Sequence, residues 1–202
     1  MFEGKSWRAA AAAAGMATLV WLSAATAERY TIDSVHSAVG FSIRHLVSRT
    51  SGNFTRFAGT IDYDPTRPDS TRVEATIEVA SIDTRHADRD RHLRSADFFA
   101  ADTYPQITFT STTARLDGDT LELAGDLTMR GVTRRLVLPV RILGLGTHPA
   151  SQAPLAGFAT TVVVKRSDFG LNTWTDAAGV LGDEVTAELT IEAAGPVPGG
   201  RG

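Results

Sequence analysis

The amino-acid sequence predicts an all-β protein: a single antiparallel barrel of eight strands with one or two short helices. Apolar and polar residues alternate with a period of two over much of the chain from about Tyr30 to Ala193, which is typical of half-buried strands. Turn-forming residues separate several of these segments, as at Asp117-Gly118-Asp119 and Arg130-Gly131. Strands of about ten residues, roughly 30 Å long, in up-and-down order favour a closed barrel over a sandwich.

Each expected strand carries one apolar face. In the first, Val39, Phe41 and Ile43 alternate with small or polar residues, and in the last, Val185, Ala187, Leu189 and Ile191 do the same. The segment 158–165 is ambiguous, because both of its faces carry valine or alanine. The eight strands are expected at residues 39–44, 57–63, 73–79, 106–110, 121–130, 136–142, 158–165 and 184–192.

Two short segments are expected to be helical. One is the charged run from Asp88 to Phe99, and the other is a capped turn at Ser167-Asp168-Phe169-Gly170. The charged run has two interpretations: a solvated connection that closes one end of the sheet, or the rim of a site. We favour the first for most of its charges, since exposed ion pairs are common and individually weak. The expected pairs join arginines to aspartates: Arg44, Arg91 and Arg94 to Asp88, Asp90 and Asp97.

The first 27 residues have the pattern of a secretory signal peptide. Lys5 and Arg8 precede an apolar stretch, Ala9 to Leu22, that is too short for a comfortable membrane span of about 20 residues. Ala25-Thr26-Ala27 then offers small residues where a signal peptidase cleaves. A membrane anchor is the alternative, and the cleavage site argues against it. We therefore expect cleavage after Ala27, export to the periplasm, and no integral membrane segment in the mature chain.

Composition excludes several classes of function. The chain has a formal net charge of −3 and no basic block, so a nucleic-acid partner is not expected. It has no cysteine, which excludes a lipoprotein anchor, a haem-attachment motif and a disulfide framework. One domain is expected over residues 28–194, followed by a disordered tail at 195–202 that is rich in glycine and proline.

A barrel of eight strands can be filled by its own side chains or can hold one small ligand. The inward residues here are mostly aliphatic, and a solid core predicts that composition as well as a hollow one does. His45 is in register with Val39, Phe41 and Ile43, so it is expected to point inward at the end of its strand. Arg166 stands in a similar relation to the preceding strand. Both are candidates to hold the head group of an amphipathic guest.

The chain resembles the YceI-like family of exported, lipocalin-like proteins that bind polyisoprenoids. The resemblance depends on the order and spacing of many short motifs along the whole mature chain. They are Tyr30-Thr-Ile-Asp33, His36-Ser-Ala-Val-Gly-Phe-Ser-Ile-Arg-His-Leu46, Gly52-Asn-Phe54, Phe57-Ala-Gly-Thr-Ile61, Ala80-Ser-Ile-Asp-Thr84, Asp88 to Phe99, Tyr104-Pro105 with Phe109, Gly125-Asp-Leu127, Arg130-Gly-Val-Thr133, Ala156-Gly-Phe158, Arg166-Ser-Asp-Phe-Gly170 and Gly182-Asp-Glu-Val185. The segment from Thr147 to Leu155 departs from the family pattern.

The resemblance implies an eight-stranded lipocalin-like barrel with an elongated apolar lumen that binds, stores or transports a long isoprenoid or related lipid, such as a quinone tail or a polyprenyl phosphate. It also implies a homodimer in the periplasm of a Gram-negative cell. It carries no catalytic residues, and we expect no cofactor apart from a bound isoprenoid or fatty-acid-like lipid. The expected lumen residues are Phe41, Ile43, Phe57, Ile77, Phe109, Leu127, Met129, Leu138 and Val140, with His45 and Arg166 at the head group.

Three alternatives remain open from the sequence. A packed barrel would suit a periplasmic stress or interaction protein without a ligand. An enzyme acting on an isoprenoid-type lipid would need His45, Asp90 and His92 to converge as acids and bases, although no Gly-x-Ser-x-Gly motif is present. A metal site would need His36 or His45 to come close to His86 and His92, because two ligands do not make a site. We expect neither catalytic residues nor a metal.

Overall fold

The fold is seen in a computed structural model, which describes residues 27–174 and 179–197. Strands account for most of it, and one α-helix, α1 (Ala87–Arg94), is present among the described residues. Short 3₁₀ helices occur at Pro68–Ser70, Val79–Ser81 and Arg166–Phe169. The strands are β1 (Glu28–Ile32), β2 (Ala38–His45), β3 (Ser48–Phe54), β4 (Phe57–Tyr63), β5 (Arg72–Glu78), β6 (Ile82–Asp83), β7 (Gln106–Asp117), β8 (Thr120–Met129), β9 (Val132–Thr147), β10 (Pro154–Lys165) and β11 (Leu181–Ala194).

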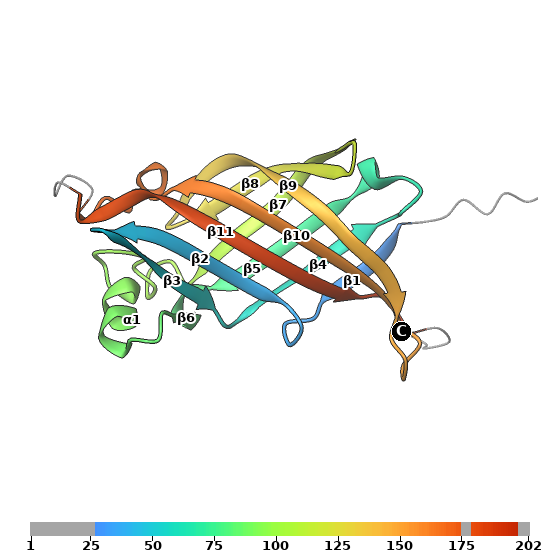
Figure 1. Cartoon of the computed structure of the whole chain (residues 1–202), viewed down its shortest axis with the longest axis horizontal. Coiled ribbons are helices and arrows are strands. Elements are labelled where there is room, and N and C mark those ends of the chain that lie inside the picture. The colour runs from blue at the N-terminus through green and yellow to red at the C-terminus, as the bar shows by residue number, and fades with distance from the viewer. Residues whose placement is uncertain (1–26, 175–178, 198–202) are drawn as a thin grey trace, which may run out of the picture.

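The sheet closes on itself into an antiparallel barrel. Strands β1, β4, β5, β7, β8, β9, β10 and β11 follow one another around it, and β11 pairs with β1 to complete the circle. Figure 1 shows the long strands β7 to β11 wrapping obliquely around the barrel axis. Closure leaves these eight strands without a bare edge. The predicted eight-stranded barrel is therefore confirmed.

Three of the eight positions around the barrel are each occupied by two strand segments in succession. Both β1 and β2 pair with β11, so together they fill one position around the barrel. The next position is filled by β4, which pairs with β1, and by β3, which pairs with β2. In the same way, β4 pairs with β5 while β3 pairs with β6. The interruptions lie at residues 33–37, 55–56 and 79–81. The eleven segments thus fill eight strand positions around the barrel, with β2, β3 and β6 towards the end that holds α1 (Figure 1).

The expected strands correspond to β2, β4, β5, β7, β8, β9, β10 and β11, while β1, β3 and β6 were not among them. Strand β3 has the sequence Ser-Arg-Thr-Ser-Gly-Asn-Phe, in which only Phe54 is a large apolar residue. Alternation of apolar residues therefore gives no signal there, and pairing with β2 through hydrogen bonds makes it a strand. Strand β9 also extends past the expected end at residue 142 to Thr147, across a bulge at Leu143 where the register with β10 shifts.

The barrel end that holds β1 is closed by packed side chains. Tyr30, Tyr63 and Phe158 are buried there, and the rings of Tyr63 and Phe158 meet edge to face with centroids 5.4 Å apart. Ala156 and Ala193 are fully buried and allow the neighbouring strands to approach. Large apolar side chains with small ones between them close this end without a covering helix.

The opposite end is covered by α1, as expected for a connection that closes the sheet (Figure 1). Asp90 is the buried residue of the helix, and its carboxylate accepts hydrogen bonds from the main-chain N–H of Thr84 at 2.9 Å and the Thr84 hydroxyl at 2.5 Å. Arg94 donates to the main-chain carbonyls of Ala80 and Ile82. These bonds attach the helix to the end of the barrel next to β6.

The expected ion pairs around α1 are only partly correct. Arg91 and Asp88 do pair, at 2.8 Å. Asp97 instead lies 3.4 Å from His92, and Arg44 donates to main-chain carbonyls rather than to a carboxylate. Buried main-chain carbonyls need donors as much as carboxylates do, and the arginines here satisfy them.

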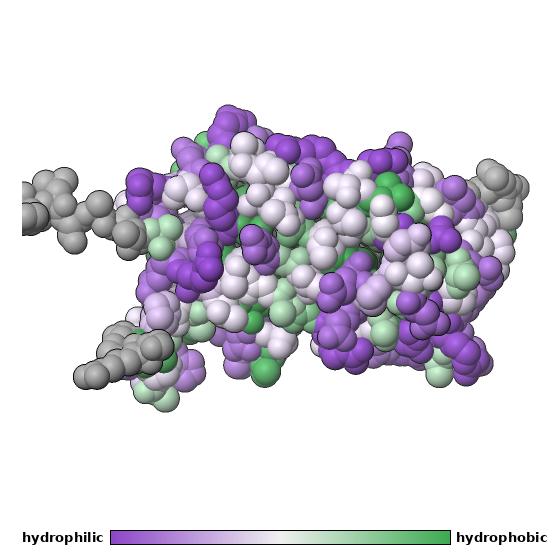
Figure 2. All heavy atoms as spheres, turned by 180° about the vertical axis from the view of Figure 1, so that it is seen from behind, coloured by the Kyte–Doolittle hydropathy of each residue, from purple (hydrophilic) through white to green (hydrophobic). Residues whose placement is uncertain are grey.

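The other expected turns are present. Gly170 follows the 3₁₀ helix Arg166–Phe169 in a left-handed conformation, and Arg130 and Gly131 both have positive φ in the tight turn between β8 and β9. Polar residues cover most of the outer face seen in Figure 2, with scattered apolar ones. Residues 1–26 of the expected signal peptide and 198–202 of the expected tail lie outside the described residues; Gly195, at the start of that tail, donates to the carbonyl of Pro154.

Candidate functional site

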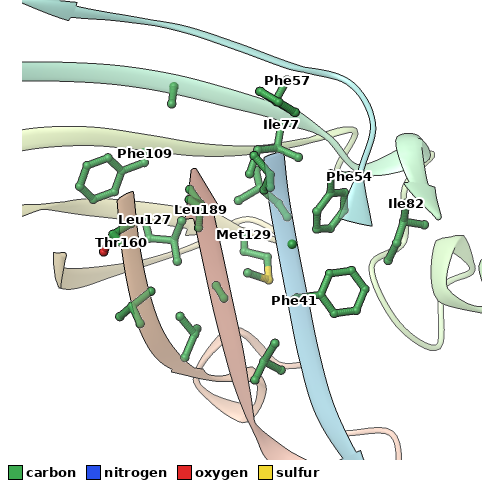
Figure 3. Close-up of a pocket in the computed structure, with 18 of the residues that line it drawn as sticks. Phe41, Phe54, Phe57, Ile77, Ile82, Phe109, Leu127, Met129, Thr160 and Leu189 are labelled. Carbon is green, nitrogen blue, oxygen red and sulfur yellow. The ribbon is translucent and has the colours of Figure 1, made fainter. Parts of the chain in front are cut away.

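The interior of the barrel contains a cavity of about 650 Å³. Aliphatic and aromatic side chains from all around the wall line it, and Figure 3 shows among them Phe41 from β2, Leu127 and Met129 from β8, and Leu189 from β11. A cavity of this size lies within the range of about 300–1,000 Å³ typical of small-molecule sites. The barrel is therefore hollow, which the sequence left open.

The burial of the inward side chains gives a second view of this hollowness. Leu121 and Leu123 point inward and are buried at 1% and 3% exposure. Phe41, Met129 and Leu189 also line the cavity but are only partly buried, because the cavity leaves part of each side chain without a neighbour. An apolar ligand bound inside the barrel would cover this exposed apolar surface, which is energetically favourable.

The structure places every expected lumen residue on the cavity wall. They are Phe41, Ile43, Phe57, Ile77, Phe109, Leu127, Met129, Leu138 and Val140. The alternation of side chains along a strand explains this outcome, because one face of each half-buried strand must point into the barrel. Which of these side chains contact a ligand stays a prediction.

The two expected head-group residues also line the cavity. His45 is the last residue of β2, where it pairs with Ser48 and Leu181 and is partly buried. Arg166 is buried at 5% exposure, directly after β10. Both lie in the half of the barrel that α1 covers, since the cavity wall there also includes Arg89 and His92 of that helix.

Arg166 is held almost entirely by main-chain carbonyls. Its Nε donates to Gly182 at 2.8 Å, and its Nη1 donates to Leu171 at 2.6 Å and Thr173 at 2.7 Å. Its Nη2 is buried and has no hydrogen-bond partner. Burial lowers the pKa of Arg166, and the nearby Asp183 carboxylate opposes this. A buried guanidinium with an unsatisfied donor is costly, so Arg166 is the side chain of the cavity with most to gain from an anionic group.

The cavity reaches the surface at a group of polar and exposed residues. We call this opening the mouth and define it by His45, Asp88, Arg89, His92 and Trp174. Asp88 has 75% of its side chain exposed and Trp174 is 47% exposed, yet both line the cavity. The ring of His92 stands edge-on to Trp174, with centroids 5.5 Å apart. Aromatic, basic and acidic groups therefore surround the mouth, whereas the opposite end is packed.

Some wall residues were not expected from the sequence. Phe54 ends β3, the polar strand that alternation missed, and it packs against Phe41 with ring centroids 5.7 Å apart. Leu189 lies on the apolar face of the last strand, so alternation predicts that it points inward, although it is not among the nine expected lumen residues. Trp174 lies in an irregular segment after β10, where no periodicity exists to predict its direction.

The groups needed for acid–base catalysis do not gather as the enzyme hypothesis requires. His45 and His92 line the cavity, but Asp90 does not, because its carboxylate is bound to Thr84. Burial raises the pKa of Asp90, but the hydrogen bonds from Thr84 and the charges of Arg94 and Arg89 outweigh this, so the pKa lies below its ordinary value of 3.8. Asp90 is thus a structural carboxylate.

A different group of residues meets the distance criterion for a metal site. The side-chain ligand atoms of Asp33, His36 and Glu192 lie within 4.8 Å of one another, at the break between β1 and β2. Nδ1 of His36 is 2.7 Å from Oδ2 of Asp33, a hydrogen-bond distance. None of the three residues lines the cavity, and the expected partners His86 and His92 are not in the group. We therefore interpret it as a hydrogen-bonded carboxylate–histidine pair.

Among residues 27–174 and 179–197, no helix has the length and apolar character needed to span a membrane.

Comparison with known proteins identifies the family that shares this barrel. The family model described as "YceI-like domain" matches residues 30–193. Protein YceI of Shigella flexneri is 41% identical over 171 residues, which cover 83% of this chain and 87% of the relative. Protein YceI of Salmonella arizonae is 39% identical over the same lengths.

Solved structures show the same architecture. Burkholderia cenocepacia BcnA is 27% identical with a TM-score of 0.73, covering 80% of this chain and 98% of its own. The Campylobacter jejuni YceI protein is 33% identical with a TM-score of 0.66, covering 81% and 96%. A polyisoprenoid-binding domain from Saccharophagus degradans, 16% identical with a TM-score of 0.64, covers 83% of this chain and 98% of its own, and shares the fold.

Proposed function

Because this chain belongs to the YceI-like family, we propose that it binds one long-chain isoprenoid or related lipid inside the barrel without transforming it. The observation that carries the proposal is the apolar cavity of about 650 Å³, closed at one end by packed tyrosines and phenylalanine and bordered at the other by polar groups. Removing apolar surface from water favours enclosure by about 25 cal/mol per Å². A long, water-insoluble tail is the ligand that gains most from such a site.

The head group of the lipid would lie near Arg166 and His45. Arg166 carries a positive charge and a free Nη2 donor, and no carboxylate of the described residues is within ion-pair distance of it. Guanidinium groups bind phosphate and carboxylate well. This favours an anionic lipid, such as a polyprenyl phosphate, over a neutral quinone. The Saccharophagus degradans domain, described as polyisoprenoid-binding, is consistent with the tail.

The wider setting is proposed on the sequence pattern. The signal-peptide pattern over the first 27 residues supports export and a periplasmic location, where a water-insoluble lipid would need a carrier to cross an aqueous space. Storage or transport of the lipid, and a homodimer, complete the proposal. Cell fractionation and sedimentation of the exported protein would check location and oligomeric state. Incubating the protein with its lipid and recovering that lipid unchanged would check that binding is not followed by catalysis.

The experiment that tests the ligand is native mass spectrometry of the protein purified from its own cells, followed by organic extraction of what it releases. A stoichiometric isoprenoid or related lipid is the expected result. Protein that carries no lipid and takes up neither polyprenyl phosphate nor polyprenol would overturn the proposal and favour a ligand-free interaction protein.

Two variants sharpen this experiment. Met129→Trp adds bulk to the cavity wall and should displace the lipid, whereas Val137→Trp adds the same ring at an outward position that is 49% exposed and should not. Arg166→Gln should bring the affinity for polyprenyl phosphate down to that for neutral polyprenol. If Arg166→Gln weakens both lipids equally, Arg166 acts only through the fold and the head-group assignment is wrong.

A further inference from the structure

The tip of the β2–β3 hairpin exposes two apolar side chains beside the mouth of the cavity. Leu46 and Val47 form the two-residue connection, and they are 53% and 103% exposed. The preceding residue, His45, lines the cavity, and the main-chain N–H of Leu46 donates to the carbonyl of Val180 at 2.9 Å. In Figure 1 this tip lies at the same end as α1, opposite the end where β9 finishes.

The residue types at this tip are not those that the turn itself requires. Leu46 has a φ of +50°, and Val47 does not share the positive φ. A two-residue hairpin turn with this pattern favours glycine at its first position, and leucine is strained there by about 1–2 kcal/mol. A β-branched residue is equally unusual at an exposed turn. Polar turn residues would fold better, so these apolar side chains point to a role outside folding.

A third exposed apolar group lies at the same mouth. Trp174 is 47% exposed and lines the cavity, with its ring against His92 and Phe98. Tryptophan is enriched where proteins meet the boundary between lipid head groups and acyl chains, because one part of its ring is apolar and the other donates a hydrogen bond. Leu46, Val47 and Trp174 together present apolar groups around the opening of the proposed lipid site.

Two arginines lie beside the tip. Arg44 donates to the carbonyls of Leu46 and Gly179, and Arg49 donates to Ser42 and Thr186. Among the described residues, neither guanidinium is within ion-pair distance of a carboxylate. In contrast, Asp88 on the neighbouring helix is paired with Arg91. Two arginines that keep their charge beside an apolar tip are suited to an anionic membrane surface.

From these observations we infer that the hairpin tip at Leu46 and Val47 docks the mouth of the barrel onto an anionic phospholipid bilayer, with Trp174 at the interface. The inference rests on the proposed lipid-binding function, since it explains how a water-insoluble tail could pass from a membrane into the cavity without crossing water. The two apolar side chains enter the head-group region, and Arg44 and Arg49 face lipid phosphates.

Vesicle flotation tests this directly. The chain from Glu28 to Gly202 contains every strand of the closed barrel, and Trp174 is its one tryptophan. It should float with vesicles of phosphatidylethanolamine and phosphatidylglycerol, and much less with pure phosphatidylcholine. Trp174 fluorescence should shift to shorter wavelength on binding and be quenched by brominated acyl chains.

The matched variants separate the tip from apolar exposure in general. Leu46→Ser with Val47→Ser should lower the partition coefficient about tenfold or more, because the buried apolar area is lost. Leu143→Ser with Leu145→Ser removes two leucines that are each 52% exposed, on β9 near the other end of the barrel, and should leave partitioning unchanged. Equal losses in both double variants would overturn the inference.

The failure of this inference can be told apart from the failure of the proposed function. The tip variant should still retain lipid when loaded in detergent and examined by native mass spectrometry. Wild-type protein that holds a lipid but does not bind vesicles would overturn docking alone. Vesicle binding by protein that takes up no lipid would overturn the proposed function alone. A tip variant that changes oligomeric state, with no vesicle binding by the wild type, would make the tip an interface between copies and overturn docking.

Discussion

The ring of Phe109 lies across the main chain at Gly125 on the neighbouring strand. A β-carbon added at Gly125 would be 2.5 Å from Cζ of Phe109 and 2.5 Å from the carbonyl oxygen of Thr110. Gly52 has the same relationship to another cavity ring, with a β-carbon 2.6 Å from Cζ of Phe41. In both places a glycine lets an aromatic ring lie flat along the wall, which keeps the ring out of the cavity.

Gly125→Ala should therefore both destabilise the barrel and narrow its cavity. The added methyl group must displace the Phe109 ring or the main chain, and overpacking of this kind costs about 1–3 kcal/mol. Urea unfolding monitored by circular dichroism would measure the loss. Gly146→Ala is the control, because no atom lies within 4 Å of its added β-carbon. A Gly125 variant as stable as the Gly146 variant would contradict the packing described here.

Truncating two leucines of the inner face should have very different costs. Leu121 is packed at 1% exposure, so Leu121→Ala should lower the free energy of unfolding by about 2–5 kcal/mol. Leu189 borders the cavity and is only partly buried, so Leu189→Ala in lipid-free protein should cost about 1 kcal/mol or less.

Adding lipid should increase the difference between wild type and Leu189→Ala, since the guest then packs against that side chain. Chemical denaturation with and without lipid would measure both quantities. Equal costs for the two leucines in lipid-free protein would mean that the cavity collapses in solution.

Asp90 should contribute stability that is lost in acid. Burial raises its pKa, but hydrogen bonds from Thr84 outweigh burial and hold the pKa below 3.8. A carboxylate whose pKa is lower in the folded state stabilises the fold above its unfolded value, and this contribution disappears as the pH falls through the folded value. Unfolding free energies of wild type and Asp90→Asn, measured from about pH 6 down to about pH 3, should converge as the pH falls. A constant difference would show that Asp90 is not the titrating group.

His36 should show the opposite dependence. The hydrogen bond to Asp33 raises the pKa of His36 above its ordinary value of 6.5, and the charge of Glu192 contributes in the same direction. Its stabilising effect is therefore complete below the unfolded pKa and is lost as the pH rises through the folded pKa. An NMR titration should give a pKa above 6.5 that falls in Asp33→Asn. An unchanged value in that variant would contradict the pairing.

The strands that the sequence predicted are those in which one face is continuously apolar. The face Val185, Ala187, Leu189 and Ile191 is an example, and it became β11. The missed strand β3 shows the limit of this approach, because its residues are mostly polar and only its ladder with β2 makes it extended. The short β6 likewise depends on two pairs with β3. Such segments owe their conformation to partners, not to their own composition.

The candidate site also contains residues that the sequence predicts and residues that it does not. Inward direction follows from alternation, so the nine expected lumen residues all line the cavity, and the ends of the strands pointed to His45 and Arg166. Phe54 was missed because it ends the mostly polar strand β3. The direction of Trp174 could not be predicted, because it follows an irregular segment. The expected pairing of Arg44 with a carboxylate was wrong because a local charge pattern does not show which main-chain carbonyls lack donors.

The sequence by itself determined an eight-stranded barrel with an aliphatic interior, since the alternation of side chains along a strand is a local property. Only the tertiary structure decided that the interior is hollow, that Nη2 of Arg166 is left without a partner, and that Leu46, Val47 and Trp174 share one end with the mouth. Each of these depends on distances between side chains far apart in the chain. Closure of the barrel sets those distances, and no local pattern records them.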